Sequence, residues 1–188
     1  MRKLGRSEDE YVCHLSARVS ARLLLGGADP EDETLKAYYK WLLAEVQSGD
    51  KTRMLLALSC LAQAFRRPPF RLAFCHMPNA VDALRVLINA DAPVQQLYQA
   101  TLCFWIMSFS ENSVKAMGET AFAAVAAVSD VLASAKKEKV VRVAVAFLRN
   151  MAELEDKEKS LEATTLMVSH RLLTVVQGLA TQGTFSYV

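Results

Sequence analysis

The chain has 188 residues, of which 52% are hydrophobic and 22% charged, so it is long enough to bury the core of one domain. Its formal net charge is only +2, and so weak a field argues against a nucleic-acid-binding protein or one held on an anionic membrane. The basic N-terminus is followed by acidic residues, and the longest uncharged stretch, residues 92–110, contains three glutamines. Neither a signal peptide nor a direct membrane insertion is therefore expected.

Apolar residues recur at intervals of three and four along almost the whole chain, which predicts helices and no strands. The expected ends coincide with capping or breaking residues, such as the Ser7/Glu10 capping box, Gly49 and Pro93. The predicted helices cover residues 8–25, 31–48, 50–65, 70–76, 79–88, 94–109, 111–118, 120–135, 136–155 and 160–180. Residues 1–7 and 182–188 are expected to be flexible.

Buried stripes follow from the same spacing. In residues 31–48 the predicted stripe is Leu35, Tyr38, Tyr39, Leu42, Leu43 and Val46. In residues 136–155 it is Val140, Ala144, Phe147, Leu148, Met151 and Leu154. Residues 94–109 are apolar nearly all round; one predicted side holds Leu97, Thr101, Phe104, Trp105 and Ser108, and the other holds Tyr98, Leu102, Ile106 and Phe109.

Three similar segments indicate an internal repeat. LSCLA (58–62), MSFSE (107–111) and LRNMA (148–152) each lie late in an apolar helix, and they begin 49 and 41 residues apart. Armadillo and HEAT units repeat about every 40–47 residues, and they stack because one unit cannot bury both of its faces. The prediction is an all-α, armadillo/HEAT-like right-handed α-α superhelix that forms a single domain over residues 1–188. The alternative is an irregular helical bundle.

Sequence motifs of catalysis are missing. There is no GxxxxGK[ST], HExxH, GxSxG or GxGxxG sequence. The histidines (His14, His76, His170) are far apart, and the cysteines (Cys13, Cys60, Cys75, Cys103) form no CxxC pair. Cys13-His14 and Cys75-His76 are neighbours that would point to different faces of a helix. No catalytic residue, cofactor or metal site is expected, and the cysteines are interpreted as buried thiols in a reducing compartment.

The best candidates for a binding site lie in residues 136–155. Lys137 and Lys139 lie near a predicted helix N-terminus, where each lysine opposes the helix dipole by about 0.3–1 kcal/mol, which motivates the hypothesis that they meet an acidic partner. Arg142 and Arg149 are seven residues apart and so share one helix face, with Asn150 next to it; the planar guanidinium group is well suited to carboxylates. The simpler alternative is a solvated start of a helix.

Residues 128–150, VSDVLASAKKEKVVRVAVAFLRN, resemble the signature of the H subunit of the vacuolar proton-pumping ATPase (V-ATPase). The matching parts are SDVL (129–132), KEKV (137–140), Arg142 and LRN (148–150). Residues 97–110, residues 13–18 and the last predicted helix are also similar to this family, so the resemblance covers about residues 11–180. The family's members are much longer, and the chain is expected to correspond to the latter part of their N-terminal repeat domain, without the C-terminal domain that silences the detached catalytic sector.

This resemblance implies a non-catalytic regulatory subunit that supports ATP hydrolysis coupled to proton transport. The implied partners are the E and G subunits of the peripheral stalk, the catalytic sector and the a subunit of the membrane sector. The implied location is cytoplasmic, on the cytosolic face of vacuolar and endosomal membranes.

Two other functions stay open. The first is a general armadillo adaptor for trafficking or nuclear import. Import receptors hold basic peptides with Trp and Asn four residues apart, but here Trp105 is followed by Phe109, and Asn150 is preceded by Ala146. The second is an enzyme without a recognisable motif.

Overall fold

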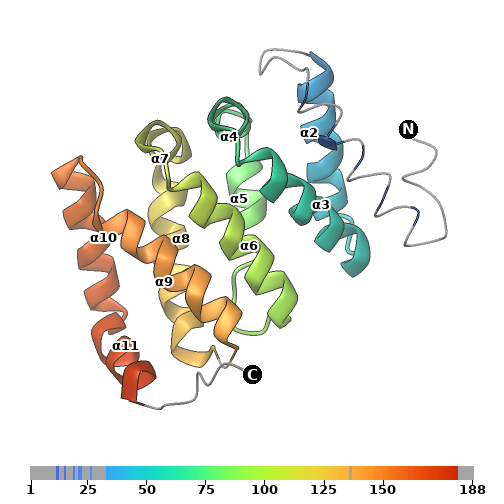
Figure 1. Cartoon of the computed structure of the whole chain (residues 1–188). Helices are drawn as coiled ribbons and strands as arrows, with labels where there is room; N and C mark the ends of the chain where they lie inside the picture. The colour runs from blue at the N-terminus through green and yellow to red at the C-terminus, as the bar shows by residue number, and fades with distance from the viewer. Residues whose placement is uncertain are drawn as a thin grey trace. The chain divides into compact units, whose positions relative to one another are not determined.

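A computed structural model describes residues 33–135 and 137–181, together with residues 12, 15, 19, 21, 22 and 26 (Figure 1). These residues contain no strand. The helices are α2 (Glu33–Val46), α3 (Lys51–Ala64), α4 (Pro68–Cys75), α5 (Ala80–Arg85), α6 (Val94–Met107), α7 (Glu111–Met117), α8 (Glu119–Ser134), α9 (Glu138–Ala152), α10 (Lys157–Ser169) and α11 (Leu172–Thr181). The predicted capping box and both predicted tails lie outside the described residues. The chain divides into two compact units, Met1–Ala83 and Leu84–Val188.

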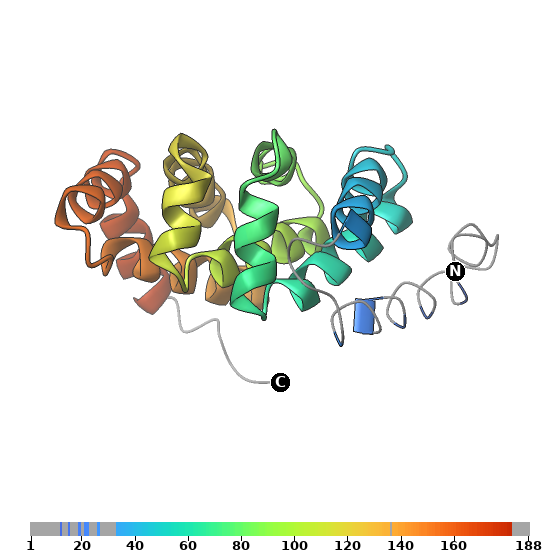
Figure 2. The same ribbon diagram turned by 90° about the horizontal axis from the view of Figure 1, so that it is seen from above.

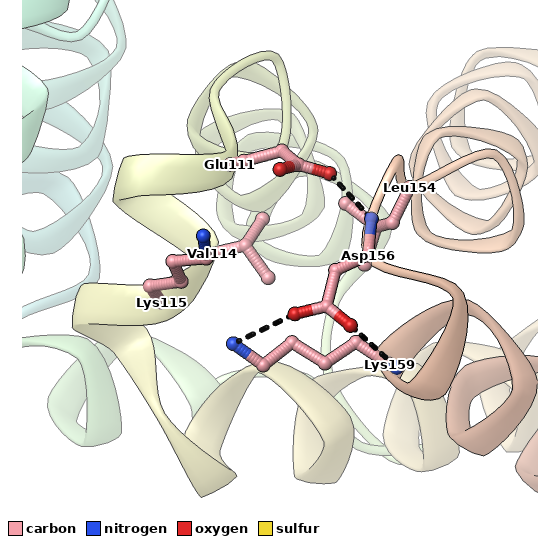
Figure 3. A pocket seen from close by; sticks show the side chains of 6 residues that line it. All are labelled: Glu111, Val114, Lys115, Leu154, Asp156 and Lys159. Carbon is pink, nitrogen blue, oxygen red and sulfur yellow. Dashed lines mark hydrogen bonds and ion pairs between the residues drawn. The ribbon is translucent and has the colours of Figure 1, made fainter.

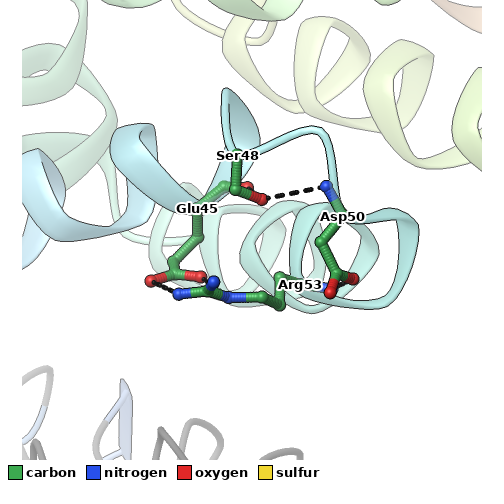
Figure 4. A network of polar contacts seen from close by, with 4 residues as sticks. All are labelled: Glu45, Ser48, Asp50 and Arg53. Atoms are coloured by element: carbon green, nitrogen blue, oxygen red, sulfur yellow. Dashed lines mark hydrogen bonds and ion pairs between the residues drawn. The ribbon is translucent and has the colours of Figure 1, made fainter.

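The turn between α2 and α3 in the first unit is held by polar contacts (Figure 4). The Asp50 carboxylate accepts the backbone N–H of Arg53 at 3.0 Å and so caps α3. The Arg53 guanidinium donates to both carboxylate oxygens of Glu45, at 2.6 and 2.9 Å. Gly49 has φ +76, a left-handed conformation that glycine adopts without steric cost. The predicted helix end at Gly49 and the predicted start at Asp50 are therefore confirmed.

The core of the first unit is aromatic. Tyr39 packs edge-on against Phe74, with ring centroids 5.3 Å apart, and donates its buried hydroxyl to the carbonyl of Phe70 at 3.0 Å. Phe65 lies 4.9 Å from Phe74. The predicted stripe of α2 is confirmed, except that Leu43 is only half-buried.

In the second unit α6 and α9 lie side by side and make its most extensive helix contact (Figure 1). The two helices run in the same direction, as two side-chain hydrogen bonds show. Lys139 bonds to Gln95 near the N-terminal ends of the helices, and Asn150 bonds to Ser108 at their C-terminal ends. Phe104 and Phe147 meet edge-to-face between them, with centroids 5.9 Å apart. Helix α8 packs on α9 and α10, and α7 and α8 meet at a bend of 94° (Figure 2).

Helices α3, α6 and α9 end at regular intervals along the chain. Their C-cap residues are Phe65, Ser108 and Glu153, which are 43 and 45 residues apart. The predicted repeat length is therefore right, but its alignment was wrong. Leu58 lies inside α3, whereas Met107 is the last residue of α6, so these two positions are not equivalent.

Two helix predictions were wrong in extent. The helix expected over residues 79–88 ends at Arg85, and Asn79 before it has φ +58. The helix expected over residues 160–180 is divided into α10 and α11 at Arg171, which has φ +55 and interrupts the helical path. Within the described residues, no single helix is long and apolar enough to span a membrane; α7 and α8 reach that length and composition only as a bent pair.

Candidate protein-binding site

Helix α9 is strongly amphipathic, and this fixes which side chains it offers to a partner. All six residues predicted to point inward are buried: Val140, Ala144, Phe147, Leu148, Met151 and Leu154. On the opposite side Lys139, Arg142 and Arg149 are exposed, as the spacings of three and seven residues require. The predicted cationic face of this helix is therefore present in the structure.

The two lysines occupy different settings. Lys137 is the exposed N-cap residue of α9, and its side chain makes no capping hydrogen bond. The Lys139 ammonium reaches across to α6, where it donates to the Gln95 side-chain oxygen at 2.6 Å and lies 5.3 Å from the centroid of the Tyr98 ring. Lys139 therefore joins the surface of α9 to that of α6, partly through a cation–π contact.

Both arginines are paired along their own helix. The Arg142 Nη2 lies 2.5 Å from the Glu138 carboxylate, and the Arg149 Nε donates to the Glu153 carboxylate at 3.0 Å. The arginine side chains are 59% and 72% exposed. Such exposed pairs typically contribute only about 0.2–1 kcal/mol, so a partner's carboxylates could replace the glutamates at little cost.

Asn150 lies at the edge of the cationic face and turns towards α6. Its amide nitrogen donates to the Ser108 hydroxyl at 3.0 Å, and that hydroxyl donates to the Trp105 carbonyl at 2.7 Å. Ser108 is 5% exposed, so this contact is largely screened from water. Asn150 therefore holds the C-terminal ends of α6 and α9 together.

Helix α6 adds an uncharged stripe beside these cations. Tyr98, Leu102 and Trp105 are half-buried, and Phe109, just beyond the helix, is 56% exposed. The Trp105 and Phe109 rings lie 5.4 Å apart. We define the α6–α9 face as Tyr98, Leu102, Trp105, Phe109, Lys139, Arg142 and Arg149.

The prediction from sequence assigned Trp105 and Ile106 to the wrong sides of α6. It grouped Trp105 with Leu97 and Thr101, and Ile106 with Tyr98. In the structure Leu97, Thr101 and Ile106 are buried, while Trp105 shares the solvent side with Tyr98. Seven residues are almost two full helical turns, and this period should have linked Trp105 to Tyr98. Ser108 and Gln95, which contact Asn150 and Lys139, could not be identified because the pairs are 42 and 44 residues apart in sequence.

A second polar cluster lies where α7 meets the turn before α10 (Figure 3). The backbone N–H of Asp156 donates to the Glu111 carboxylate at 3.0 Å, and the Asp156 carboxylate caps α10 through the N–H of Lys159 at 3.3 Å. The Lys159 ammonium lies 3.7 Å from the same carboxylate. Each carboxylate of the cluster thus accepts a backbone N–H, and Asp156 also pairs with Lys159, so the cluster joins α7 to the start of α10.

Two buried thiols, those of Cys75 and Cys103, are not activated nucleophiles. Burial raises the pKa of Cys75 to about 12, although the nearby Arg71 opposes this shift. Burial also raises the pKa of Cys103, which is fully enclosed. The reactive form of cysteine is the thiolate, so these protonated thiols serve as core residues. Within the part of the chain that the structure describes, no three His, Cys, Asp or Glu side chains gather as metal ligands would.

Comparison with known proteins identifies one family. The family model for the H subunit of the V-ATPase matches residues 2–184. The chain is 25% identical to the V-type proton ATPase H subunit of Drosophila melanogaster, over 88% of this chain and 35% of the relative. It is 24% identical to the probable H subunit 1 of Caenorhabditis elegans, over 92% of this chain and 39% of the relative. The chain thus spans little more than a third of the length of these relatives.

Solved structures resemble the fold. A designed armadillo repeat protein in complex with the peptide (KR)4 matches with a TM-score of 0.72 at 14% identity, over 96% of this chain and 73% of that chain. An engineered protein matches with the same TM-score at 18% identity, over 96% of this chain and 72% of that chain. The predicted fold class, an all-α superhelical repeat of the armadillo type, is confirmed.

Proposed function

Because the chain belongs to the family of V-ATPase H subunits, we propose that it is a non-catalytic regulatory subunit of the proton-pumping V-ATPase. In this role it binds the peripheral stalk through the E and G subunits and supports ATP hydrolysis coupled to proton transport. The observation that carries the proposal is the family match over residues 2–184. Since the relatives are much longer, the role concerns what this repeat segment contributes to the pump.

The α6–α9 face supports a binding role rather than a chemical one. It is a surface of rings and cations on two helices that are bonded to each other at both ends. A rigid surface loses little conformational entropy when a partner binds, which favours affinity. We assign the partner contacts to Lys137, Lys139, Arg142 and Arg149, with Asn150 fixing the register of the two helices.

The proposal includes a location and further partners. The chain works in the cytoplasm, on the cytosolic face of vacuolar and endosomal membranes, to which the pump complex holds it. There it also meets the catalytic sector and the a subunit of the membrane sector.

Affinity isolation tests this function directly. The full chain, tagged at one end, is expressed in the cells from which it comes, and co-purifying proteins are identified by mass spectrometry. Pump subunits, with E and G among them, are expected. Recovery of no pump subunit would overturn the proposal.

A second measurement addresses catalysis. The purified chain is expected to hydrolyse no ATP by itself, whereas adding it to pumps depleted of their own H subunit is expected to raise proton transport driven by ATP. ATP turnover by the isolated chain, abolished by a point substitution in that chain, would show an enzyme and contradict the non-catalytic role.

A further inference from the structure

Two stripes of different chemistry run side by side along the α6–α9 face. The stripe on α6 is uncharged and mostly aromatic, and the stripe on α9 is cationic. Because the helices are parallel and joined by Lys139–Gln95 near one end and by Asn150–Ser108 at the other, the stripes stay parallel along their length. A partner that fits must carry apolar groups along one edge and negative groups along the neighbouring edge.

The spacing within each stripe indicates the backbone conformation of that partner. Tyr98 and Trp105 are seven residues apart, and so are Arg142 and Arg149, which corresponds to about 10.5 Å along a helix. A partner α-helix presents the same side every seven residues, over the same length. An extended strand covers about 10.5 Å in three residues, and side chains three apart point to opposite faces. The spacing therefore favours a helix that lies along α6 and α9.

We propose that the α6–α9 face binds an acidic amphipathic α-helix of a partner protein. Its carboxylates, seven residues apart, meet Arg142 and Arg149, and its large aliphatic side chains pack on Tyr98, Leu102 and Trp105. This inference rests on the proposed function, because it specifies the chemistry of one partner of that subunit.

Glu138 and Glu153 act as internal substitutes for the partner's carboxylates. In the free chain they hold the two guanidinium groups along α9 at 2.5 and 3.0 Å. On binding, the partner's carboxylates share or replace these contacts in a surface from which water is excluded, where ion pairs are stronger. The two glutamates therefore compete with the partner's carboxylates for the arginines, so removing the glutamate charges is expected to increase the affinity for the partner.

A direct test uses Trp105 as the reporter. The chain has two tryptophans, so in a Trp41→Phe background Trp105, which lies on the proposed face, is the sole tryptophan. The probe is a capped 21-residue peptide of three heptads with Leu and Glu on adjoining edges and Ala and Gln elsewhere. The control peptide has the same composition, with its Glu residues moved to the edge opposite Leu. Saturable change in Trp105 fluorescence is expected, with affinity for the aligned peptide about tenfold higher than for the control. No binding, or equal binding of both peptides, would overturn the proposal.

Charge variants test the assigned cations. Arg142→Glu/Arg149→Glu changes the net charge by −4, and we expect it to weaken binding of the aligned peptide about tenfold or more, a change of about 1.4 kcal/mol per tenfold. Lys40→Glu/Lys157→Glu changes the net charge equally at exposed positions on α2 and α10 that do not belong to the α6–α9 face. It is expected to keep the affinity within about threefold, because exposed charges that do not touch the peptide are largely screened at 0.15 M salt. Equal weakening by both pairs would indicate attraction by net charge alone and contradict the assignment. Circular dichroism of each variant verifies that it is folded.

The competing glutamates give a test of opposite sign. Glu138→Gln/Glu153→Gln is expected to tighten binding of the aligned peptide about threefold or more, while Glu155→Gln/Glu162→Gln, which removes two exposed carboxylates elsewhere, is expected to have a smaller effect. A lack of difference between these two variants would exclude the exchange of carboxylates.

The outcomes separate this inference from the proposed function. If pump subunits co-purify equally with the wild-type chain and with the Arg142→Glu/Arg149→Glu variant, and the aligned peptide does not bind, the pump role stands and the acidic-helix site is wrong. If the aligned peptide binds but no pump subunit is recovered, the site is right and the pump role is wrong.

Discussion

At the scale of single residues, the contact between Phe104 and Phe147 is central to the packing of α6 on α9. Both rings are fully buried, and their centroids are 5.9 Å apart. Phe147→Ala removes a large buried ring and leaves a cavity, so we expect it to lower the free energy of unfolding by about 3–5 kcal/mol. Urea unfolding followed by circular dichroism measures this change.

A control for this substitution lies on the same helix. Val145 is 38% exposed, and Val145→Ala is expected to cost less than about 1 kcal/mol. If the two variants were equally stable, the aromatic contact would not organise this part of the core.

The buried thiol of Cys75 makes stability depend on pH in the alkaline range. Its pKa is about 12 in the folded chain, whereas an unfolded cysteine titrates near about 8.5. Below about pH 8.5 both states keep the proton, and the thiol contributes no pH dependence. Between about pH 8.5 and 12 the unfolded state releases its proton while the folded state keeps it, so stability falls by up to about 1.4 kcal/mol per pH unit.

Comparison of slopes tests this effect. Between pH 8 and 10 the free energy of unfolding of the Cys75→Ala variant is expected to fall less steeply with pH than that of the wild-type chain, although its value at pH 7 is lower. Cys103, whose pKa burial also raises, leaves part of the slope in place. Thr165→Ala, at an exposed position, should keep the wild-type slope. Parallel curves for wild-type and Cys75→Ala would contradict the assigned pKa.

At the scale of helices, Gly118 makes the sharp bend between α7 and α8 possible. It has φ +57 and ψ −138, a region that is almost restricted to glycine, and a Cβ there would meet no atom within 4 Å. The cost of Gly118→Ala is therefore conformational rather than steric crowding by neighbours. We expect a loss of about 1–3 kcal/mol in the free energy of unfolding, measured by thermal or urea unfolding.

A Gly→Ala substitution at Gly178 is expected to raise the free energy of unfolding, whereas the one at Gly118 lowers it. Gly178 lies within α11, and a Cβ there also meets no atom within 4 Å. Because glycine is a poor helix former, Gly178→Ala should stabilise the chain by about 0.5–1 kcal/mol. Equal effects of both substitutions would show that the backbone conformation at Gly118 is not the cause.

Helix ends were predictable where the sequence carries a local stop or start. Gly49, Asp50 and Pro93 each act on the backbone next to them, and the observed ends lie within a few residues of the predictions. The break at Arg171 has no such signal, because arginine rarely adopts a positive φ and no Gly or Pro is adjacent. The neighbouring His170 ring contacts Asp130 on α8, and one sequence does not reveal such a contact between residues 40 apart.

At the scale of the whole molecule, the all-helical repeat fold was predictable because helices of this kind must share their apolar faces. The exposed residues of α9 could be predicted from the spacing of its apolar residues alone. The neighbours of that exposed side could not be predicted, because the residues that contact Lys139 and Asn150 are positioned by the packing of α6 on α9. The general lesson is that periodicity identifies which residues of one helix are available, while only the tertiary structure shows what lies beside them.

Repeat architecture predicts that the C-terminal helices fold without the N-terminal ones, because each repeat contacts mainly its neighbours. Long-range contacts within the second unit, such as Phe104–Phe147 and Lys139–Gln95, join residues that are all C-terminal to Ala83. A fragment of residues 77–188, which begins before α5 and so keeps that helix whole, is therefore expected to be helical and to unfold in one cooperative transition. Circular dichroism during urea unfolding measures both properties.

The control is a shorter fragment whose first residue lies within the second unit, so that part of this unit is missing. Residues 111–188 lack α6, so Phe147 and the apolar side of α9 lose their principal partner helix. This shorter fragment is expected to show a broad transition without a native baseline, because an exposed apolar face removes the main driving force for folding. If both fragments unfolded with equal cooperativity, packing between α6 and α9 would not be what stabilises the second unit.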